Sequence, residues 1–294
     1  MSASRTTLGA DAALLGITAI WGATFVTVKG ALDESDPFTF LTWRFTLGAA
    51  SAALLARGQL RDPAVWRRGL PLGGLMFLGY ALQTLGLQTT SPARSAFLTG
   101  LTVVFVPFAT RVVALVPPRQ PVEPVKLAAW LSLGLAAAGL WQLSGVELLA
   151  PWSTGDLLTL ACALAYGFHI AATGRAAPGV APLALVAVQL TVTAGLSAAA
   201  TLVVPTHLTL TPGFLGAVAL TGLVASTFAI SVQVWAQART AAVRAAVIYS
   251  LEPVFAVAWG LALGTPWPVA SELVGGGLLI GAVLVSELGA ALQR

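Results

Sequence analysis

Long apolar runs alternate with short polar segments along the whole chain. Ten runs each reach about the 20 residues that an α-helix needs to cross a hydrocarbon core of roughly 30 Å. A helix satisfies its own backbone hydrogen bonds, so it can cross lipid, where no water is available. The pattern therefore predicts an all-α polytopic membrane protein that leaves no room for a soluble domain. The expected spans are residues 12–32, 37–57, 69–89, 94–116, 124–144, 154–174, 181–204, 212–236, 242–264 and 268–290.

Composition narrows the class further. Of the 294 residues, 57% are hydrophobic and 9% are charged, whereas soluble domains carry about 25% charged residues. A single cysteine, Cys162, excludes a disulfide or a cysteine metal site within one chain. The net charge of +4 is explained by basic residues that flank membrane spans, so it does not indicate nucleic-acid binding.

The basic residues predict an orientation. If the amino terminus is cytoplasmic, twelve of the fifteen Lys and Arg residues lie in cytoplasmic segments. Lys29 and Arg94 would lie outside, and Arg44 within the second span. By the positive-inside rule we expect both termini in the cytoplasm.

The two halves of the chain resemble each other. A shift of 150 residues places residues 90–105 (TSPARSAFLTGLTVVF) on residues 240–255 (TAAVRAAVIYSLEPVF). Chance similarity between two helices rich in Ala, Val and Leu is the alternative explanation. An odd number of spans per half inserts the halves in opposite directions, which predicts an inverted 5+5 repeat, residues 1–146 and 147–294, with a substrate site between them. The identities are Thr90 with Thr240, Arg94 with Arg244, Ala96 with Ala246, Leu101 with Leu251, Val104 with Val254 and Phe105 with Phe255.

The ninth span places Glu252 directly before Pro253. A carboxylate in the middle of a membrane helix is costly and indicates a functional site. Pro253 lacks an amide hydrogen and frees the carbonyl of Tyr249, which lipid tolerates only where protein, water or a cavity satisfies it. Glu252 has either a direct role in binding or coupling, or a structural role in holding a bent helix. The 150-residue shift pairs it with Thr102, so only one half carries a charge here.

Arg44 lies seven residues after Pro37, about 10 Å deep at 1.5 Å per residue. Its long side chain could extend to the outer headgroups, or it could serve as a carboxylate-binding or gating residue. Both interpretations remain open from the sequence.

Polar and aromatic side chains recur on most spans. Each would lose its hydration without a partner in lipid, so we expect them to face one cavity or another helix. His169 is a candidate proton carrier because histidine titrates near neutral pH, and a neutral hydrogen-bonding residue is the alternative. The substrate-binding candidates are Trp21, Thr24, Tyr80, Gln83, Thr99, Tyr166, His169, Gln233, Tyr249 and Glu252, and the candidates for gating or coupling are Arg44, His169 and Glu252.

Local signals add smaller expectations. Pro107 predicts a break near the middle of the fourth span, and Asp156 is expected to cap the sixth. Residues 117–124 (PPRQPVEP) read as a stiff link, and residues 266–268 (Pro-Trp-Pro) as an outer turn. The glycines at 275–277 and 281 are expected to be close-packing positions.

Five segments in order resemble the EamA branch of the drug/metabolite transporter superfamily, across essentially the whole chain. The resemblance implies a ten-helix inverted repeat that exports amino acids, amines and metabolites by alternating access, and the chain is most similar to YddG-type exporters of aromatic and neutral amino acids. It departs from the family at Thr265, where an acidic residue is frequent. The segments are IWGATFVTVK (20–29), DPFTFLTWRF (36–45), LGYALQTLGLQTTSPARSAFLTGL (78–101), GDLLTLACALAYG (155–167) and TAAVRAAVIYSLEPVFAVAWGLALG (240–264).

These observations predict a secondary transporter in a bacterial-type cytoplasmic membrane. The alternatives are an exporter of other small metabolites or drugs, and a channel-like facilitator. An enzyme is disfavoured, because the ionisable residues within spans are too sparse to form a catalytic set. We expect no cofactor and no metal, a small-molecule substrate and the lipid bilayer as partners, facilitated or weakly proton-linked transport, and a monomer, with a dimer as the alternative.

Overall fold

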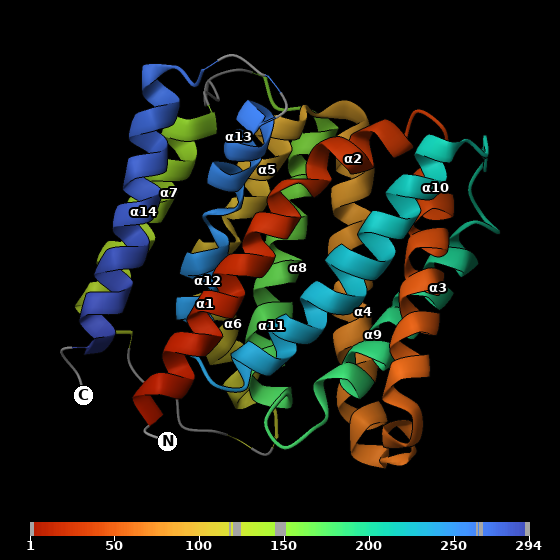
Figure 1. Cartoon of the computed structure of the whole chain (residues 1–294), viewed down its shortest axis with the longest axis horizontal. Coiled ribbons are helices and arrows are strands. Elements are labelled where there is room, and N and C mark those ends of the chain that lie inside the picture. The colour runs from red at the N-terminus through yellow and green to blue at the C-terminus, as the bar shows by residue number, and fades with distance from the viewer. Residues whose placement is uncertain are drawn as a thin grey trace.

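A computed structural model describes residues 3–117, 119, 125–144, 151–262, 264 and 267–291. In this part of the chain the regular elements are all helical, and they form one bundle (Figure 1). The start of α1 and the end of α14 lie at the same face of the bundle, which we call the terminal face. The fold class expected from the apolar runs, an all-α polytopic membrane protein, is confirmed.

The elements follow one another in chain order. They are α1 (Ala3–Gly22), α2 (Thr24–Ala31), α3 (Pro37–Ala56), η1 (Arg57–Arg61), α4 (Pro63–Thr89), α5 (Pro92–Gly100), α6 (Thr102–Leu115), α7 (Leu127–Ser144), α8 (Thr154–Ala176), α9 (Pro182–Ala200), α10 (Pro212–Ala219), the π-helical stretch η2 (Leu220–Phe228), α11 (Ala229–Gln237), α12 (Ala242–Tyr249), α13 (Glu252–Ala262) and α14 (Ala270–Ala291).

Each of the ten expected spans appears as one helix or as consecutive helical elements, two for the first, fourth and ninth spans and three for the eighth. Within the described ranges, nine segments are long and apolar enough to cross a membrane. The helix of the fifth expected span, Leu127–Leu143, is apolar but shorter than these nine. The third begins at Pro63 rather than near residue 69, because Asp62 accepts a hydrogen bond from Ala64 at the helix start. The expected link at 117–124 and the residue Thr265 fall largely outside the described residues, as does part of the expected turn at 266–268.

Polar caps set where several helices begin. Asp36 accepts hydrogen bonds from the amides of Phe38 and Thr39 and, across the same face, from the amide of His207. Burial alone would raise the pKa of Asp36, but these hydrogen bonds outweigh it and hold the pKa below its usual value. Asp156 takes part in the expected cap of α8 as the second member of a capping box with Ser153.

The fourth and ninth spans are broken at corresponding positions. Span four ends as α5 at Gly100 and resumes as α6 at Thr102, and span nine ends as α12 at Tyr249 and resumes as α13 at Glu252. The predicted break at Pro107 is wrong: Pro107 lies inside α6, and the break comes six residues earlier. Because a proline disturbs the turn before it, Pro253 accounts for the break in span nine, but span four breaks without a proline at the matching position.

Two close glycine contacts occupy similar places in the two halves. A Cβ atom on Gly22 of α1 would lie 3.0 Å from the Cβ of Phe255 in α13, and one on Gly167 of α8 would lie 3.0 Å from the Cβ of Phe105 in α6. Gly167 follows Gly22 by 145 residues, and Phe255 follows Phe105 by 150. The first span of each half therefore packs against the fourth span of the other half in the same way.

Packing does not follow the division of the chain into halves. α3 packs mainly against α9, and α7 against α14. One hydrophobic core joins side chains of spans one, two, three, seven and eight. A second joins spans four, five, nine and ten with Ile170 of span six, and a third joins spans one, eight and nine. Gly275 contacts Leu143 of α7 closely, as expected, whereas Gly277 and Gly281 have open space around them.

Candidate functional site

A central cavity is lined by residues of both halves of the chain. The empty space in and around it, open solvent included, is about 930 Å³. All eleven residues singled out from the sequence line it: Trp21, Thr24, Arg44, Tyr80, Gln83, Thr99, Tyr166, His169, Gln233, Tyr249 and Glu252. That they bind substrate stays a prediction.

Arg44 is held inside the protein. Its side chain is only 3% exposed, so the expectation that it extends to the outer headgroups is wrong. Nε donates to Ser226 Oγ at 3.1 Å, and the guanidinium carbon lies 4.6 Å from the centre of the Tyr80 ring. Close approach of α3 and η2 explains this position, because a Cβ atom on Gly222 would lie 2.7 Å from the backbone oxygen of Arg44.

The charge of Arg44 has no carboxylate partner. Among the residues that the structure describes, no Asp or Glu lies within ion-pair distance of it. The guanidinium interacts with the hydroxyls of Ser226 and Tyr80 and with aromatic rings, and its five N–H donors outnumber these two hydroxyl partners. Arg44 can therefore accept an anionic group from a ligand in the cavity.

Glu252 is the acidic residue in the lining. It is the first residue of α13, where the helix dipole favours a negative charge. Desolvation is the only influence found on its carboxyl group among the described residues, and its direct and structural roles both stay predictions. Glu252 can accept a cationic group from a ligand.

Aromatic rings and amides lie beside hydroxyl groups and His169 in the rest of the lining. Trp21 lies edge-on to Tyr249 with ring centres 5.5 Å apart, and Tyr80 lies edge-on to Tyr166 at 5.5 Å. Gln83 Nε2 donates to Thr99 Oγ1 at 3.2 Å. These contacts fix ring positions, so the cavity can receive an apolar or aromatic side chain without rearranging.

His169 is 4% exposed, and its Nε2 lies 2.8 Å from Gln189 Oε1. An amide partner suits the neutral hydrogen-bonding interpretation of His169. The role of proton carrier stays a prediction.

The sequence missed part of the lining. Ser250 sits at the break in span nine and lines the cavity beside Tyr249 and Glu252. The proline three residues later was a usable signal, since it placed the break there. The remaining unassigned lining is mostly apolar, and an apolar residue on a membrane helix carries no signal that separates a cavity from lipid. Within the described residues, no three His, Cys, Asp or Glu side chains are grouped so that they could hold a metal ion.

A two-repeat membrane bundle with a polar cavity lined by both halves is the architecture of a membrane transporter. The sequence matches the EamA-like transporter family twice, over residues 8–145 and 153–287, and the chain belongs to this family. It is 31% identical over 283 residues to an uncharacterized transporter of Archaeoglobus fulgidus, covering 96% of this chain and 86% of the relative. A solved crystal structure with 21% identity aligns over 100% of both chains with a TM-score of 0.77, which supports the fold.

Proposed function

We propose that this transporter exports amino acids, aromatic and neutral ones among them, by alternating access of the central cavity to the two sides of a cytoplasmic membrane. The observation that carries the proposal is that one lining holds both a guanidinium, Arg44, and a carboxyl group, Glu252, and that neither forms an ion pair within the described residues. An amino acid is a zwitterion, and its carboxylate and ammonium groups match these two side chains. A simple anion or cation would satisfy only one of them.

The apolar and aromatic part of the lining supports a preference among amino acids. Trp21, Tyr80, Tyr166 and Tyr249 offer ring faces and edges to a substrate side chain, and aromatic pairs contribute about 0.5–1.5 kcal/mol beyond their buried area. The export direction and the cytoplasmic location of both termini rest on the family and on the distribution of basic residues.

Counterflow in proteoliposomes tests the proposal. Purified protein is reconstituted, loaded with one unlabelled amino acid and assayed for uptake of radiolabelled amino acids. A carrier gives saturable flux that a counter-substrate stimulates. Flux that fails to saturate would support a channel-like facilitator instead.

Removal of one charge tests the assigned contacts. Because loss of one partner of a buried charge pair costs about 2–5 kcal/mol, Arg44→Gln is expected to raise the KM for a transported amino acid about thirtyfold or more. The KM for the corresponding amine, which lacks the carboxylate, should hardly change. Glu252→Gln should raise the KM for both compounds. Arg67→Gln, at an exposed position on α4, should change neither KM. An equal effect of Arg44→Gln on amino acid and amine would contradict the assignment.

A further inference from the structure

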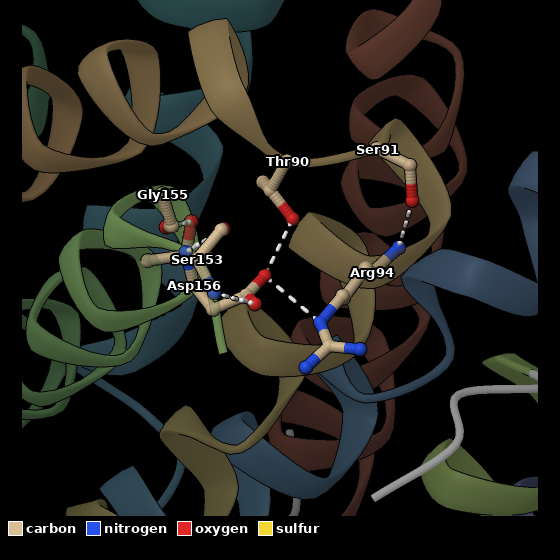
Figure 2. Close-up of polar contacts among 7 residues, drawn as sticks. Thr90, Ser91, Arg94, Ser153, Gly155 and Asp156 are labelled. Carbon is tan, nitrogen blue, oxygen red and sulfur yellow. Dashed lines mark hydrogen bonds and ion pairs between the residues drawn. The ribbon is translucent and has the colours of Figure 1, made fainter. Parts of the chain in front are cut away.

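Two corresponding ion-pair clusters join the halves at opposite faces of the bundle. In the Arg94 cluster (Thr90, Arg94 and Asp156), Arg94 Nε lies 2.8 Å from Asp156 Oδ1, and Thr90 Oγ1 donates to the same oxygen at 2.6 Å. Figure 2 shows both side chains pointing at the Asp156 carboxylate. This cluster lies where α5 and α8 begin, away from the terminal face (Figure 1).

The Arg244 cluster (Thr240, Arg244, Asp11 and Glu287) repeats this arrangement at the terminal face. Arg244 lies 2.7 Å from Asp11 Oδ2, and Thr240 Oγ1 donates to Asp11 Oδ1 at 3.0 Å. Arg244 also forms an ion pair with Glu287 of α14. The arginines and threonines are related by the 150-residue shift, and Asp156 follows Asp11 by the 145 residues that separate Gly167 from Gly22.

Each cluster lies about three helical turns from a close glycine contact on the same helix. Asp11 and Gly22 are eleven residues apart on the continuous helix α1, and so are Asp156 and Gly167 on α8. At 1.5 Å per residue, each ion pair lies about 16 Å along its helix from a close glycine contact. The glycine contacts bring α1 onto α13 and α8 onto α6 next to the cavity-lining residues Trp21 and Tyr166.

We propose that the Arg94 and Arg244 clusters are the two gates of the transport cycle, and that the Gly22–Phe255 and Gly167–Phe105 contacts are the pivots about which they open. Rotation of α8 against α5 and α6 about Gly167 separates Asp156 from Arg94 and opens the cavity away from the terminal face. Rotation of α1 against α12 and α13 about Gly22 separates Asp11 from Arg244 and opens it to the terminal face. The proposal rests on alternating access but not on the identity of the substrate.

Burial gives the ion pairs enough strength for this role. The side chains of Arg94 and Asp156 are 16% and 2% exposed, and those of Arg244 and Asp11 are 12% and 7% exposed. Exposed pairs contribute little, whereas removing one member of a buried pair is strongly unfavourable. An arginine lost from one cluster should therefore shift the population of states toward opening at that face.

Thiol accessibility tests the gates without any substrate. In a Cys162→Ala background, single reporters Val28→Cys and Ile170→Cys sit in the cavity lining, the first on α2 and the second toward the terminal end of α8. Each is exposed to a membrane-impermeant maleimide added from one side of oriented vesicles. We expect Arg94→Met to speed labelling at position 28 from the face of Arg94 about fivefold or more, the range usual for coupled sites, and to slow labelling at position 170 from the terminal face.

Arg244→Met should have the opposite effect, and Arg94→Lys, which keeps the charge, should restore the original rates. Exposed Arg67→Met is the matched control and should change neither rate. If an arginine variant does not fold, Thr90→Val and Thr240→Val weaken each cluster without removing a charge and should shift labelling in the same directions by smaller factors. Equal changes at both reporters, or none in folded protein, would overturn the proposal. A shift in labelling by a protein that fails to carry amino acids would overturn only the substrate assignment.

Discussion

The Arg94 and Arg244 clusters share a threonine, an arginine and an aspartate, but they differ in how the aspartate carboxylate is held. Asp156 is fixed at the start of α8, where its Oδ2 also accepts a hydrogen bond from the amide of Ser153 at 2.8 Å. Asp11 lies within α1, and Arg244 is shared between it and Glu287. One cluster pairs its arginine with one pre-positioned carboxylate, and the other balances its arginine against two.

This difference means that the two gates need not be equally strong. A carboxylate fixed by a helix cap loses little conformational freedom when it binds an arginine, since its position is already set. Two carboxylates around Arg244 give more attraction but repel each other, and the cluster as a whole is negatively charged. In the proposed cycle, the balance between the two open states therefore depends on residues outside the cavity.

The largest expected effect is the loss of Arg244. Arg244→Met leaves Asp11 and Glu287 close together without their cation, and breaking a buried ion pair costs about 3–5 kcal/mol. We expect its free energy of unfolding to fall by more than that of Arg94→Met, which leaves one carboxylate with its helix-cap and Thr90 hydrogen bonds intact. Thermal unfolding of the detergent-solubilised variants, with Arg67→Met as the control, measures the difference. An equal or larger fall for Arg94→Met would show that the second carboxylate adds nothing.

The sequence predicted the fold because membrane spans are set by local chemistry. Runs of about 20 apolar residues and the 150-residue match of span four to span nine were both visible in one dimension. The sequence also identified the cavity residues, since a polar side chain on a membrane helix is unfavourable in lipid and must face a cavity or another helix. Arg44 was assigned ambiguously because its depth depends on η2, whose close contact with α3 through Gly222 lies far away in the chain.

The two clusters were missed for a different reason. Arg94 and Arg244 had been matched with each other, but their partners Asp156 and Asp11 lie in the opposite halves of the chain. Which helices meet across the halves depends on packing and not on residue spacing. A signal was nevertheless present: each Asp precedes an aromatic–glycine pair, Trp21–Gly22 or Tyr166–Gly167, by the same number of residues.

A smaller change should make the Arg244 cluster resemble the Arg94 cluster. Glu287 is 31% exposed, so Glu287→Gln alone should cost less than about 1 kcal/mol. Combined with Arg244→Met, it removes the repulsion that the single variant creates, so the double variant should be more stable than Arg244→Met alone. A double-mutant cycle in thermal unfolding measures this coupling, and neighbouring charges usually give about 0.5–3 kcal/mol. Strict additivity would mean that Glu287 does not act through Arg244.

The threonines give the smallest and most specific comparison. Thr90→Val and Thr240→Val each remove one hydrogen bond to a carboxylate while keeping the shape of the side chain, at a cost of about 0.5–1.5 kcal/mol. Thr90→Val should lose more stability than Thr240→Val. Thr90 is 7% exposed and its hydrogen bond to Asp156 is 2.6 Å long, whereas the hydrogen bond from Thr240 to Asp11 is 3.0 Å long.

Thr110→Val is the matched control for these variants, since within the described part of the chain the Thr110 hydroxyl bonds only to the Val106 carbonyl of its own helix. In thermal unfolding, Thr90→Val should be less stable than Thr240→Val, and Thr110→Val should be closest in stability to the parent protein. If Thr240→Val is the more damaging, the Arg244 cluster depends on its threonine to orient Asp11. The Arg244–Asp11 ion pair would then be weaker than the Arg94–Asp156 pair, and Glu287 would offset that weakness.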